Sequence, residues 1–298
     1  MEEDMLIREI GDSIPKSWFP GHMAKSMRLI TDTVKNVDGI IYVLDARCPL
    51  ACINKKLIAT FNNKKILYLL NKSDLADKKE NEKWQKYFEK DGNKCILTEG
   101  RDLKYSRAIK DAFKLLMKEK LDRNKSKGVN KPLRFMVCGV TNTGKSTIIN
   151  NLSNSKRAQT GDKAGVTRGG QWIRLDGLEL FDTPGTMPPS FSTKEQARHL
   201  AYVGSINDDI LDFADISIAL LKEIATVTNR ELITERLGEI DLDAPLDKIL
   251  ESVCVRRGFF MSKNECDYDR GARAIIDDFR KGKLGRITLE KVDDNDGN

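Results

Sequence analysis

Eight residues of this sequence have the types and spacing of a phosphate-binding loop. They run Gly139-Val-Thr-Asn-Thr-Gly-Lys-Ser146 and match the pattern G-x-x-x-x-G-K-[ST]. In this pattern, glycines let the backbone wrap around a phosphate, and consecutive N–H groups form an anion site with the N-terminus of the next helix. We expect a strand before the loop, at 133–138, and a helix after it, from 147 to 152. The sequence therefore predicts a nucleoside triphosphate site.

The polar residues of the loop have predicted roles in binding and catalysis. Lys145 would reach the β- and γ-phosphates, which makes it a catalytic candidate, and Ser146 would be a ligand of Mg²⁺. We expect the loop to contact the nucleotide through Asn142, Thr143, Gly144, Lys145, Ser146 and Thr147.

A second motif indicates which base is bound. Asn71-Lys-Ser-Asp74 follows an apolar run at 65–70, so it is expected at the C-terminal end of a strand. The carboxylate of Asp74 can accept hydrogen bonds from both N1–H and the 2-amino group of guanine, and adenine has no such donor pair. Asn71 would support the loop or contact the base edge, the stem of Lys72 would cover the face of the base, and Ser73 would lie beside it. The predicted substrate is GTP.

A third motif, Asp182-Thr-Pro-Gly185, is expected on the Mg²⁺ side of the nucleotide. Asp182 would lie near the metal through a water molecule, and the N–H of Gly185 would meet the γ-phosphate. Thr167 would supply the second hydroxyl ligand of Mg²⁺. That assignment depends on its position between the other two motifs.

Strands and helices alternate through the first two thirds of the chain. This pattern predicts an α/β fold with a doubly wound, mostly parallel sheet, whose ligands bind at the C-terminal ends of the strands. A hairpin is expected to turn at Asp176-Gly177. The predicted strands are 39–45, 65–70, 94–98, 133–138 and the hairpin 171–181, and the predicted helices lie near 24–35, 54–61, 81–90 and 104–123.

From about residue 194 the pattern becomes helical, which predicts a separate all-helical domain with helices at 208–226, 230–237, 246–257 and 268–280. The end of this domain is rich in basic side chains. A charged helix face and a contact patch for an RNA backbone explain them equally well. The candidate RNA-binding residues are Arg256, Arg257, Arg270, Arg273, Arg280, Lys281, Lys283 and Arg286.

The motifs stand in an unusual order, because N-K-x-D precedes the phosphate loop instead of following it. The sheet can still close if the basic connector 124–132 joins the last helix of the usual arrangement to its first strand. The segment at and after residues 182–185, which would sense the γ-phosphate and which we call the switch, then runs directly into the helical domain. We predict a flexible arm at 1–16, a circularly permuted P-loop GTPase domain at 17–190, a helical domain at 191–288 and a disordered tail at 289–298.

Composition limits the class of protein. Of the 298 residues, 32% are charged, and the net charge of +6 with a pI near 8.9 is compatible with a polyanionic partner. No apolar run is long enough to span a bilayer, and the first residues lack the form of a signal peptide. The six cysteines lack the spacing of a zinc site. We expect a cytoplasmic protein that does not associate with membranes.

The chain resembles a known family in three respects. These are the segment Trp18-Phe-Pro-Gly-His-Met23, the permuted motif order and the helical tail with its Met261-Ser and Asp267-Tyr-Asp269. Over residues 17–290 it is similar to the circularly permuted ribosome-biogenesis GTPases of the RbgA/YlqF type. The resemblance implies a GTP hydrolase that acts as a switch late in assembly of the large (50S) ribosomal subunit. Such a factor would bind ribosomal RNA of the precursor particle in its GTP form, be stimulated by the particle, leave after hydrolysis and be monomeric away from the ribosome.

The resemblance also implies roles for particular residues. Asn142 would help hold K⁺, a fixed positive charge near the phosphates. Thr186 stands where GTPases usually have a water-orienting glutamine, so hydrolysis by the isolated protein should be slow. His22, a turn residue from its local sequence alone, becomes a candidate for orienting the catalytic water. Glu99 and Gly100, after Thr98, occupy the place of a further motif that contacts the base in similar GTPases.

Two other functions share some of these motifs. A non-catalytic, GTP-loaded RNA-binding scaffold would also lack the glutamine that Thr186 replaces. An ATP-dependent small-molecule kinase would share the phosphate loop, but Asp74 disfavours it because adenine lacks the donors that this carboxylate requires.

Overall fold

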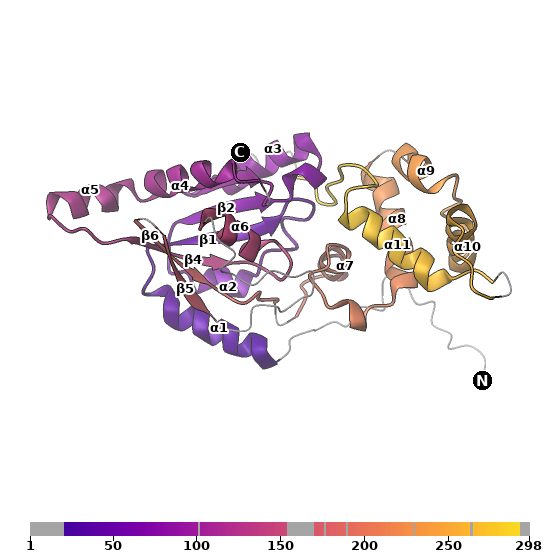
Figure 1. The fold of residues 1–298 in the computed structure, drawn as a ribbon, viewed down its shortest axis with the longest axis horizontal. Helices are drawn as coiled ribbons and strands as arrows, with labels where there is room; N and C mark the ends of the chain where they lie inside the picture. The colour runs from indigo at the N-terminus through magenta and orange to yellow at the C-terminus, as the bar shows by residue number, and fades with distance from the viewer. Residues whose placement is uncertain are drawn as a thin grey trace.

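The computed structural model describes residues 21–292 except 101, 154–169, 176, 189, 229 and 263–264. Its centre is a six-stranded sheet in the order β3-β2-β1-β4-β6-β5 (Figure 1). All neighbouring strands are parallel except β5 and β6, which form the hairpin predicted around Gly177. The strands are β1 (Gly39–Asp45), β2 (Ile66–Asn71), β3 (Lys94–Thr98), β4 (Leu133–Cys138), β5 (Gln171–Leu175) and β6 (Leu178–Asp182).

Helices cover both faces of the sheet, as a doubly wound fold requires. Every residue of β1 and β2 is buried, because their apolar side chains meet helices on each side. One face packs against Phe113 of α4 and Ile149 of α6, and the other against Ile30 of α1 and Trp84 of α3. The helices of this part are α1 (Gly21–Val34), α2 (Lys55–Ala59), α3 (Lys78–Phe88), α4 (Tyr105–Leu116), α5 (Lys118–Ser126) and α6 (Lys145–Leu152).

The permuted chain closes as the sequence predicted. Strand β4, which precedes the phosphate loop, lies between β1 and β6 and is parallel to both. The helix predicted at 104–123 divides into α4 and α5 at Met117, where the backbone leaves the helical conformation. The side chain of Met117 is buried, and a Cβ added to Gly39 would lie 2.8 Å from its Cε. Burial of Met117 therefore accompanies the bend between the two helices.

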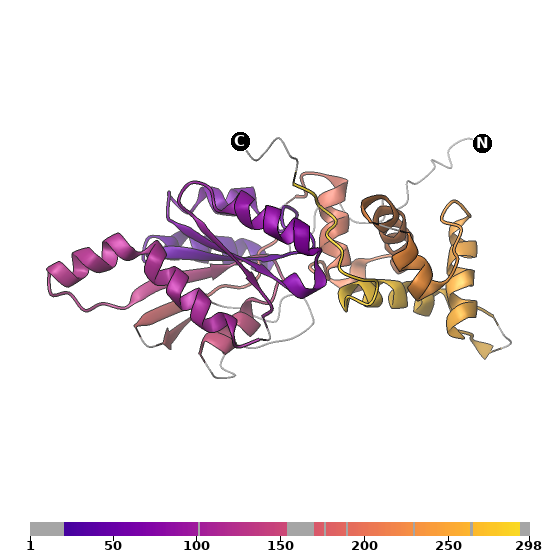
Figure 2. The same cartoon turned by 90° about the horizontal axis from the view of Figure 1, so that it is seen from above.

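The helical domain forms a second lobe, and α7 lies between this lobe and the sheet (Figures 1 and 2). The bounds predicted for the last two helices agree with the structure. The helix predicted from residue 208 begins instead as a short 3-10 turn, and α8 starts only after Asp212, whose side chain caps it. The helices are α7 (Lys194–Tyr202), α8 (Phe213–Val227), α9 (Glu231–Leu237), α10 (Leu246–Arg257) and α11 (Tyr268–Arg280). No helix in the described ranges is long and apolar enough to cross a membrane.

The chain after α11 returns to the GTPase domain. Ile287 N–H donates to the carbonyl of Leu75 at 3.1 Å, and Leu289 N–H donates to the carbonyl of Arg47 at 2.8 Å. The indole N–H of Trp84 donates to the carbonyl of Glu290 at 3.0 Å. The disordered tail predicted from residue 289 was therefore wrong for Leu289 and Glu290, because backbone hydrogen bonds to a distant segment leave no local pattern. Residues 293–298 lie outside the described part.

A buried histidine joins this returning segment to the helical domain. His199 of α7 is only 1% exposed; its Nδ1 lies 2.9 Å from a carboxylate oxygen of Glu290, and its Nε2 contacts Glu223 of α8. Burial alone would lower the pKa of His199, but hydrogen bonds to these two glutamates, and their charges, raise it to about 9. The imidazolium is therefore a charged link between α7, α8 and the C-terminal segment at neutral pH.

We expect His199→Gln to lower the free energy of unfolding by about 3 kcal/mol at pH 6, since one pKa unit corresponds to about 1.4 kcal/mol. The pKa of His199 is higher in the folded than in the unfolded chain, so its contribution is complete below about pH 6.5 and is lost as pH rises through about 9. Urea unfolding of wild type and variant at pH 6 and pH 9.5 measures the loss of stability and its dependence on pH. Glu195→Gln, at a 63% exposed side chain 4.0 Å from His199, is the control and should have a small effect. An equal loss at both pH values would contradict the charged link.

Candidate nucleotide-binding site

Two glycines of the phosphate loop occupy positions that other residues cannot. Gly139 has φ +145°, and a Cβ there would lie 2.4 Å from the carbonyl oxygen of Val43 in β1. Gly144 has φ +95°, and its Cβ would lie 2.3 Å from Nδ2 of Asn71. The loop is thus packed against the ends of the two neighbouring strands, with glycine at both close approaches.

Lys145 lies inside this loop at the first turn of α6. Its Nζ donates to the carbonyl of Val140 at 2.7 Å, and the side chain is buried. Burial lowers the pKa of Lys145 to about 8, against the opposing charge of Asp182. An anionic phosphate in the loop would restore the stability of the ammonium form. This arrangement suits the phosphate contact predicted for Lys145.

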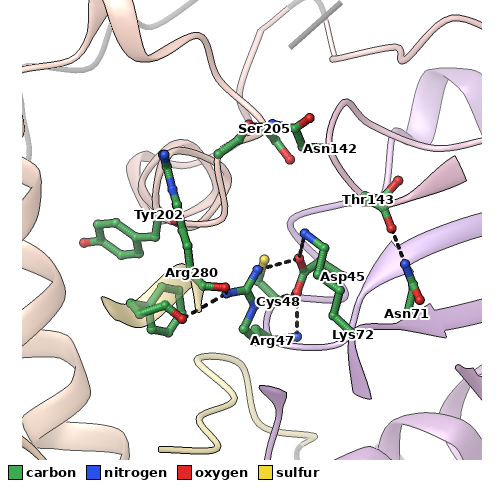
Figure 3. Close-up of polar contacts among 12 residues, drawn as sticks. Asp45, Arg47, Cys48, Asn71, Lys72, Asn142, Thr143, Tyr202, Ser205 and Arg280 are labelled. Carbon is green, nitrogen blue, oxygen red and sulfur yellow. Dashed lines mark hydrogen bonds and ion pairs between the residues drawn. The ribbon is translucent and has the colours of Figure 1, made fainter. Parts of the chain in front are cut away.

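Asn71 connects the predicted base-binding motif at residues 71–74, which we call the guanine motif, to the phosphate loop. Its Nδ2 donates to the carbonyl of Thr143 at 2.7 Å (Figure 3). Its Oδ1 accepts from Thr98 Oγ1 at 3.2 Å. A Cβ at Gly100 would lie 3.0 Å from the same amide. Asn71 therefore contacts the phosphate loop, and a contact between Asn71 and the base edge stays a prediction. Two segments 72 residues apart in the sequence therefore meet in one site.

The rest of the guanine motif lies at the rim of the same site. Lys72 has a left-handed backbone with φ +58°, and its Nζ lies 2.9 Å from a carboxylate oxygen of Asp45. Ser73 Oγ donates to the carbonyl of Thr98 at 3.2 Å. Asp74 is exposed in the short 3-10 helix Ser73–Leu75. Its carboxylate is therefore accessible to a base.

The third motif contains a buried carboxylate that fits a metal site. Asp182 ends β6 and is fully buried, and neither carboxylate oxygen has a hydrogen-bond partner in the described structure. Burial raises the pKa of Asp182 to about 6, although the charge of Lys145 opposes the shift. Such a group costs free energy unless a cation or donor meets it. Mg²⁺ and its water ligands are suitable, because magnesium prefers oxygen ligands and retains several waters.

The switch that follows Asp182 runs beside the phosphate loop. A Cβ at Gly185 would lie 2.6 Å from Cγ2 and 2.9 Å from Cα of Thr141, so only glycine permits this approach. Thr186 is fully buried; its N–H donates to the carbonyl of Gly139 at 3.2 Å, and its hydroxyl has no partner in the described structure. A short, buried side chain thus occupies the position where a water-orienting glutamine would stand.

Of the other predicted residues, some have contacts in the described structure and two have side chains that lie outside it. The carboxylate of Glu99 accepts from the Tyr105 hydroxyl at 2.9 Å. Asn142 has φ +59°, and its Nδ2 donates to the carbonyl of Gly204 at 2.6 Å. Ser146 and Thr147 lie half-buried in the first turn of α6. Thr167 lies outside the described residues, and so does the side chain of His22, whose backbone belongs to the first turn of α1.

Sequence reasoning missed a buried salt bridge at the end of β1. Asp45 Oδ2 lies 2.8 Å from Arg47 Nη2, and the same carboxylate pairs with Lys72 (Figure 3). Burial alone would raise the pKa of Asp45, but Arg47 and Lys72 hold it well below its usual range. The signal was available, because Asp45 is an acidic residue at the last position of a buried strand whose C-terminal end faces the site.

Most of the basic residues proposed for RNA contact lie on the surface of the helical domain. Two point inward: Arg257 pairs with Asp278, and Arg280 donates to the carbonyl of Tyr202 at 2.9 Å and pairs with Asp208 at 2.8 Å. The exposed members are Arg256, Arg270, Arg273, Lys281, Lys283 and Arg286. Large apolar side chains are exposed in the same region, at Phe260, Met261 and Tyr268.

The fold and this site define a circularly permuted P-loop GTPase, and comparison with known proteins agrees. Residues 134–248 match the family model described as 50S ribosome-binding GTPase. Ribosome biogenesis GTPase A of Priestia megaterium is 35% identical over 276 residues, which cover 92% of this chain and 96% of that protein. The protein of the same name from Thermotoga maritima is 30% identical over 280 residues, which cover 93% of this chain and 95% of that protein. The chain belongs to the Ribosome biogenesis GTPase A family.

Solved structures show the same fold. The crystal structure of GNP-bound YlqF from T. maritima superimposes with a TM-score of 0.61 at 27% identity, over 90% of this chain and 98% of that one. The GDP-bound structure of YlqF also has a TM-score of 0.61, at 26% identity, over 89% of this chain and 99% of that one. The similarity thus extends through both the GTPase and the helical domain.

Proposed function

We propose that this protein binds GTP with Mg²⁺ so that the phosphates lie at Lys145 and the guanine lies at Asp74. The observation that carries this proposal is the hydrogen bond between Asn71 Nδ2 and the Thr143 carbonyl, because contact between the two motifs supports one ligand shared by both. Ser146 and Asp182 would hold Mg²⁺, together with Thr167. When bound, the ion would neutralise charge that develops on the phosphates.

We further propose that GTP hydrolysis releases the protein from a late precursor of the large ribosomal subunit, in the cytoplasm. Family membership supports this role, and so does the surface of the helical domain. Its exposed arginines and lysines would contact RNA phosphates, and the nearby Phe260 and Tyr268 could stack on unpaired bases. On this proposal the GTP form binds the particle and the GDP form leaves it, and the protein is monomeric in between.

Co-sedimentation with precursor large subunits tests the switch. The expected result is retention in the particle fraction with a non-hydrolysable GTP analogue and release with GDP. Equal retention with both nucleotides, at two salt concentrations, would overturn the switch, because binding would then not depend on the γ-phosphate.

His22 is proposed to orient the catalytic water, and K⁺, held with the help of Asn142, to stabilise the transition state. We expect His22→Ala to lower particle-stimulated turnover by at least about 100-fold, the range for one catalytic group, with unchanged affinity for GTP. Single-turnover phosphate release with particles in KCl, compared with NaCl, measures both effects. Lys25→Ala, at an exposed position of the same helix, is the control. Full stimulated turnover in the His22 variant would remove this residue from the mechanism.

One observation favours a second function. The buried Thr186 cannot replace a water-orienting glutamine, which is compatible with a GTP-loaded scaffold that binds RNA without hydrolysis. The same single-turnover experiment separates the two, since a scaffold would release no phosphate when the particle is added.

A further inference from the structure

A turn of the helical domain touches the phosphate loop directly. This segment, residues 201–205, comprises the last two residues of α7 and the turn after them, and we call it the α7 turn. Ser205 Oγ donates to the carbonyl of Thr141 at 2.8 Å, and Thr141 Oγ1 donates to the carbonyl of Ser205. Gly204 accepts from the side chain of Asn142 at 2.6 Å. Thr141 and Ser205 are almost completely buried, so water cannot take the place of either hydrogen-bond partner if one is removed.

The α7 turn is held from its other side by Arg280, at the end of α11. The guanidinium donates to the carbonyls of Ala201 and Tyr202, at 2.8 and 2.9 Å, and pairs with both carboxylate oxygens of Asp208. Gly204 has φ +76°, and a Cβ there would lie 3.2 Å from Cζ of Arg280. Arg280 therefore fixes the backbone from which Gly204 and Ser205 reach the phosphate loop.

The same end of α11 is connected to the guanine side of the site. Arg47 Nη1 donates to the carbonyl of Phe279 at 3.2 Å, and its guanidinium lies 5.0 Å from the centre of the Phe279 ring. Arg47 is paired with Asp45, and Asp45 is paired with Lys72 of the guanine motif. Contacts thus run from the phosphate loop through the α7 turn and α11 to Lys72.

We propose that Ser205 and Arg280 are positioning residues for the phosphate loop, so that the helical domain completes the nucleotide site. The inference rests on the proposed function, because it assigns a task toward the same nucleotide. Its basis is geometric: the side chains of Thr141 and Asn142 are each held by the α7 turn, and the turn is held by Arg280. Because coupling between two sites is reciprocal, a partner that shifts α11 would alter nucleotide affinity, and nucleotide would alter the order of the α7 turn.

Equilibrium binding of fluorescent GTP and GDP analogues to the full chain tests the inference. Ser205→Ala removes a buried hydrogen bond and should raise Kd for both nucleotides about fivefold, which corresponds to about 1 kcal/mol. Arg280→Gln should raise both Kd values at least as much, with Arg280→Lys intermediate because lysine lacks the planar fork. The binding stoichiometry and the ratio of GTP to XTP affinity should remain unchanged, since the guanine contacts persist.

Two controls in the same domain match these variants. Ser252→Ala removes an exposed serine hydroxyl that donates to the carbonyl of Lys248, and Lys248→Gln removes an exposed ion pair with Glu251. Neither should change nucleotide affinity. Hydrogen exchange gives a second readout: nucleotide should slow exchange of the α7 turn amides in the wild type and less so in Ser205→Ala. If Arg280→Gln does not fold, Asp208→Asn weakens the same ion pair at a side chain that is 43% exposed.

Each result decides the inference. Kd values within twofold of wild type for both Ser205→Ala and Arg280→Gln would overturn it. A reduced stoichiometry with unchanged Kd would also overturn it, because that pattern reports partial unfolding. Failure of the wild-type chain to bind GTP is a separate result, and it would overturn the proposed function instead.

Discussion

Asp74→Asn is expected to lower GTP affinity by at least about 100-fold and to create affinity for XTP. The carboxylate would accept two hydrogen bonds from guanine, and hydrogen bonds to a charged group contribute about 1.5–3 kcal/mol each. The asparagine amide still accepts from N1–H, but it presents a donor to the 2-amino group. Xanthine has a carbonyl at that position, so the altered site matches XTP. Titration with GTP, ITP and XTP measures this change in base preference.

ITP separates the two contacts, because hypoxanthine keeps N1–H but lacks the 2-amino group. The wild type should therefore bind ITP less tightly than GTP, and the variant should lose less affinity for ITP than for GTP. Asp122→Asn, at an exposed position of α5, is the control and should leave all three affinities unchanged. If Asp74→Asn kept its preference for GTP over XTP, the base would have to bind elsewhere.

Asp182→Asn is expected to have opposite effects on stability and on binding. Asp182 is a buried carboxylate without a hydrogen-bond partner in the described structure, and its pKa is raised from 3.8 to about 6. Removing that charge should raise the free energy of unfolding by about 3 kcal/mol, since one pKa unit corresponds to about 1.4 kcal/mol and the shifted pKa already includes the favourable charge of Lys145. Binding of GTP with Mg²⁺ should weaken by at least about tenfold, since the oxygen that meets the hydrated ion loses its charge.

The stability gain has a defined pH dependence. A carboxyl group with a raised pKa in the folded state stabilises that state fully below about pH 4, and the contribution is lost as pH rises through about 6. The difference between Asp182→Asn and wild type should therefore grow from pH 4 to pH 6 and remain constant up to pH 7. Urea unfolding across this range measures it.

Binding assays with and without EDTA complete the test of Asp182. The loss of GTP affinity should appear only when Mg²⁺ is present. Asp111→Asn, at a 62% exposed side chain, should change neither stability nor binding. A lower stability of nucleotide-free Asp182→Asn at pH 7 would show that the carboxylate has a favourable partner in solution, which would contradict this account of the site.

Local patterns in the sequence were sufficient for the main elements and for the glycines of the site. Apolar runs predicted the strands of the sheet, and helical spacing predicted α10 and α11 with their observed bounds. Gly139 and Gly144 have the positive φ values that their motif requires. Such features depend on a few neighbouring residues, so a single sequence carries them.

Other contacts depend on residues that are far apart in the chain. The link between Arg47 and the end of α11 spans more than 230 residues, and the pair Thr141–Ser205 spans 64. Neither follows from spacing, because each needs the packed position of α7 and α11 against the sheet. The prediction of a disordered tail failed at Leu289 and Glu290 for the same reason.

The sequence by itself predicted the permuted α/β fold and the chemistry proposed for it: a phosphate loop, a guanine-selective carboxylate and a switch. It could do so because those functions need fixed residue types at fixed local spacing. Only the tertiary structure decided that Asn71 contacts the phosphate loop, that Asp182 is buried with no hydrogen-bond partner among the described residues, and that Arg280 faces the α7 turn. Side-chain direction and domain contact arise from the packing of the whole chain, which no short segment encodes.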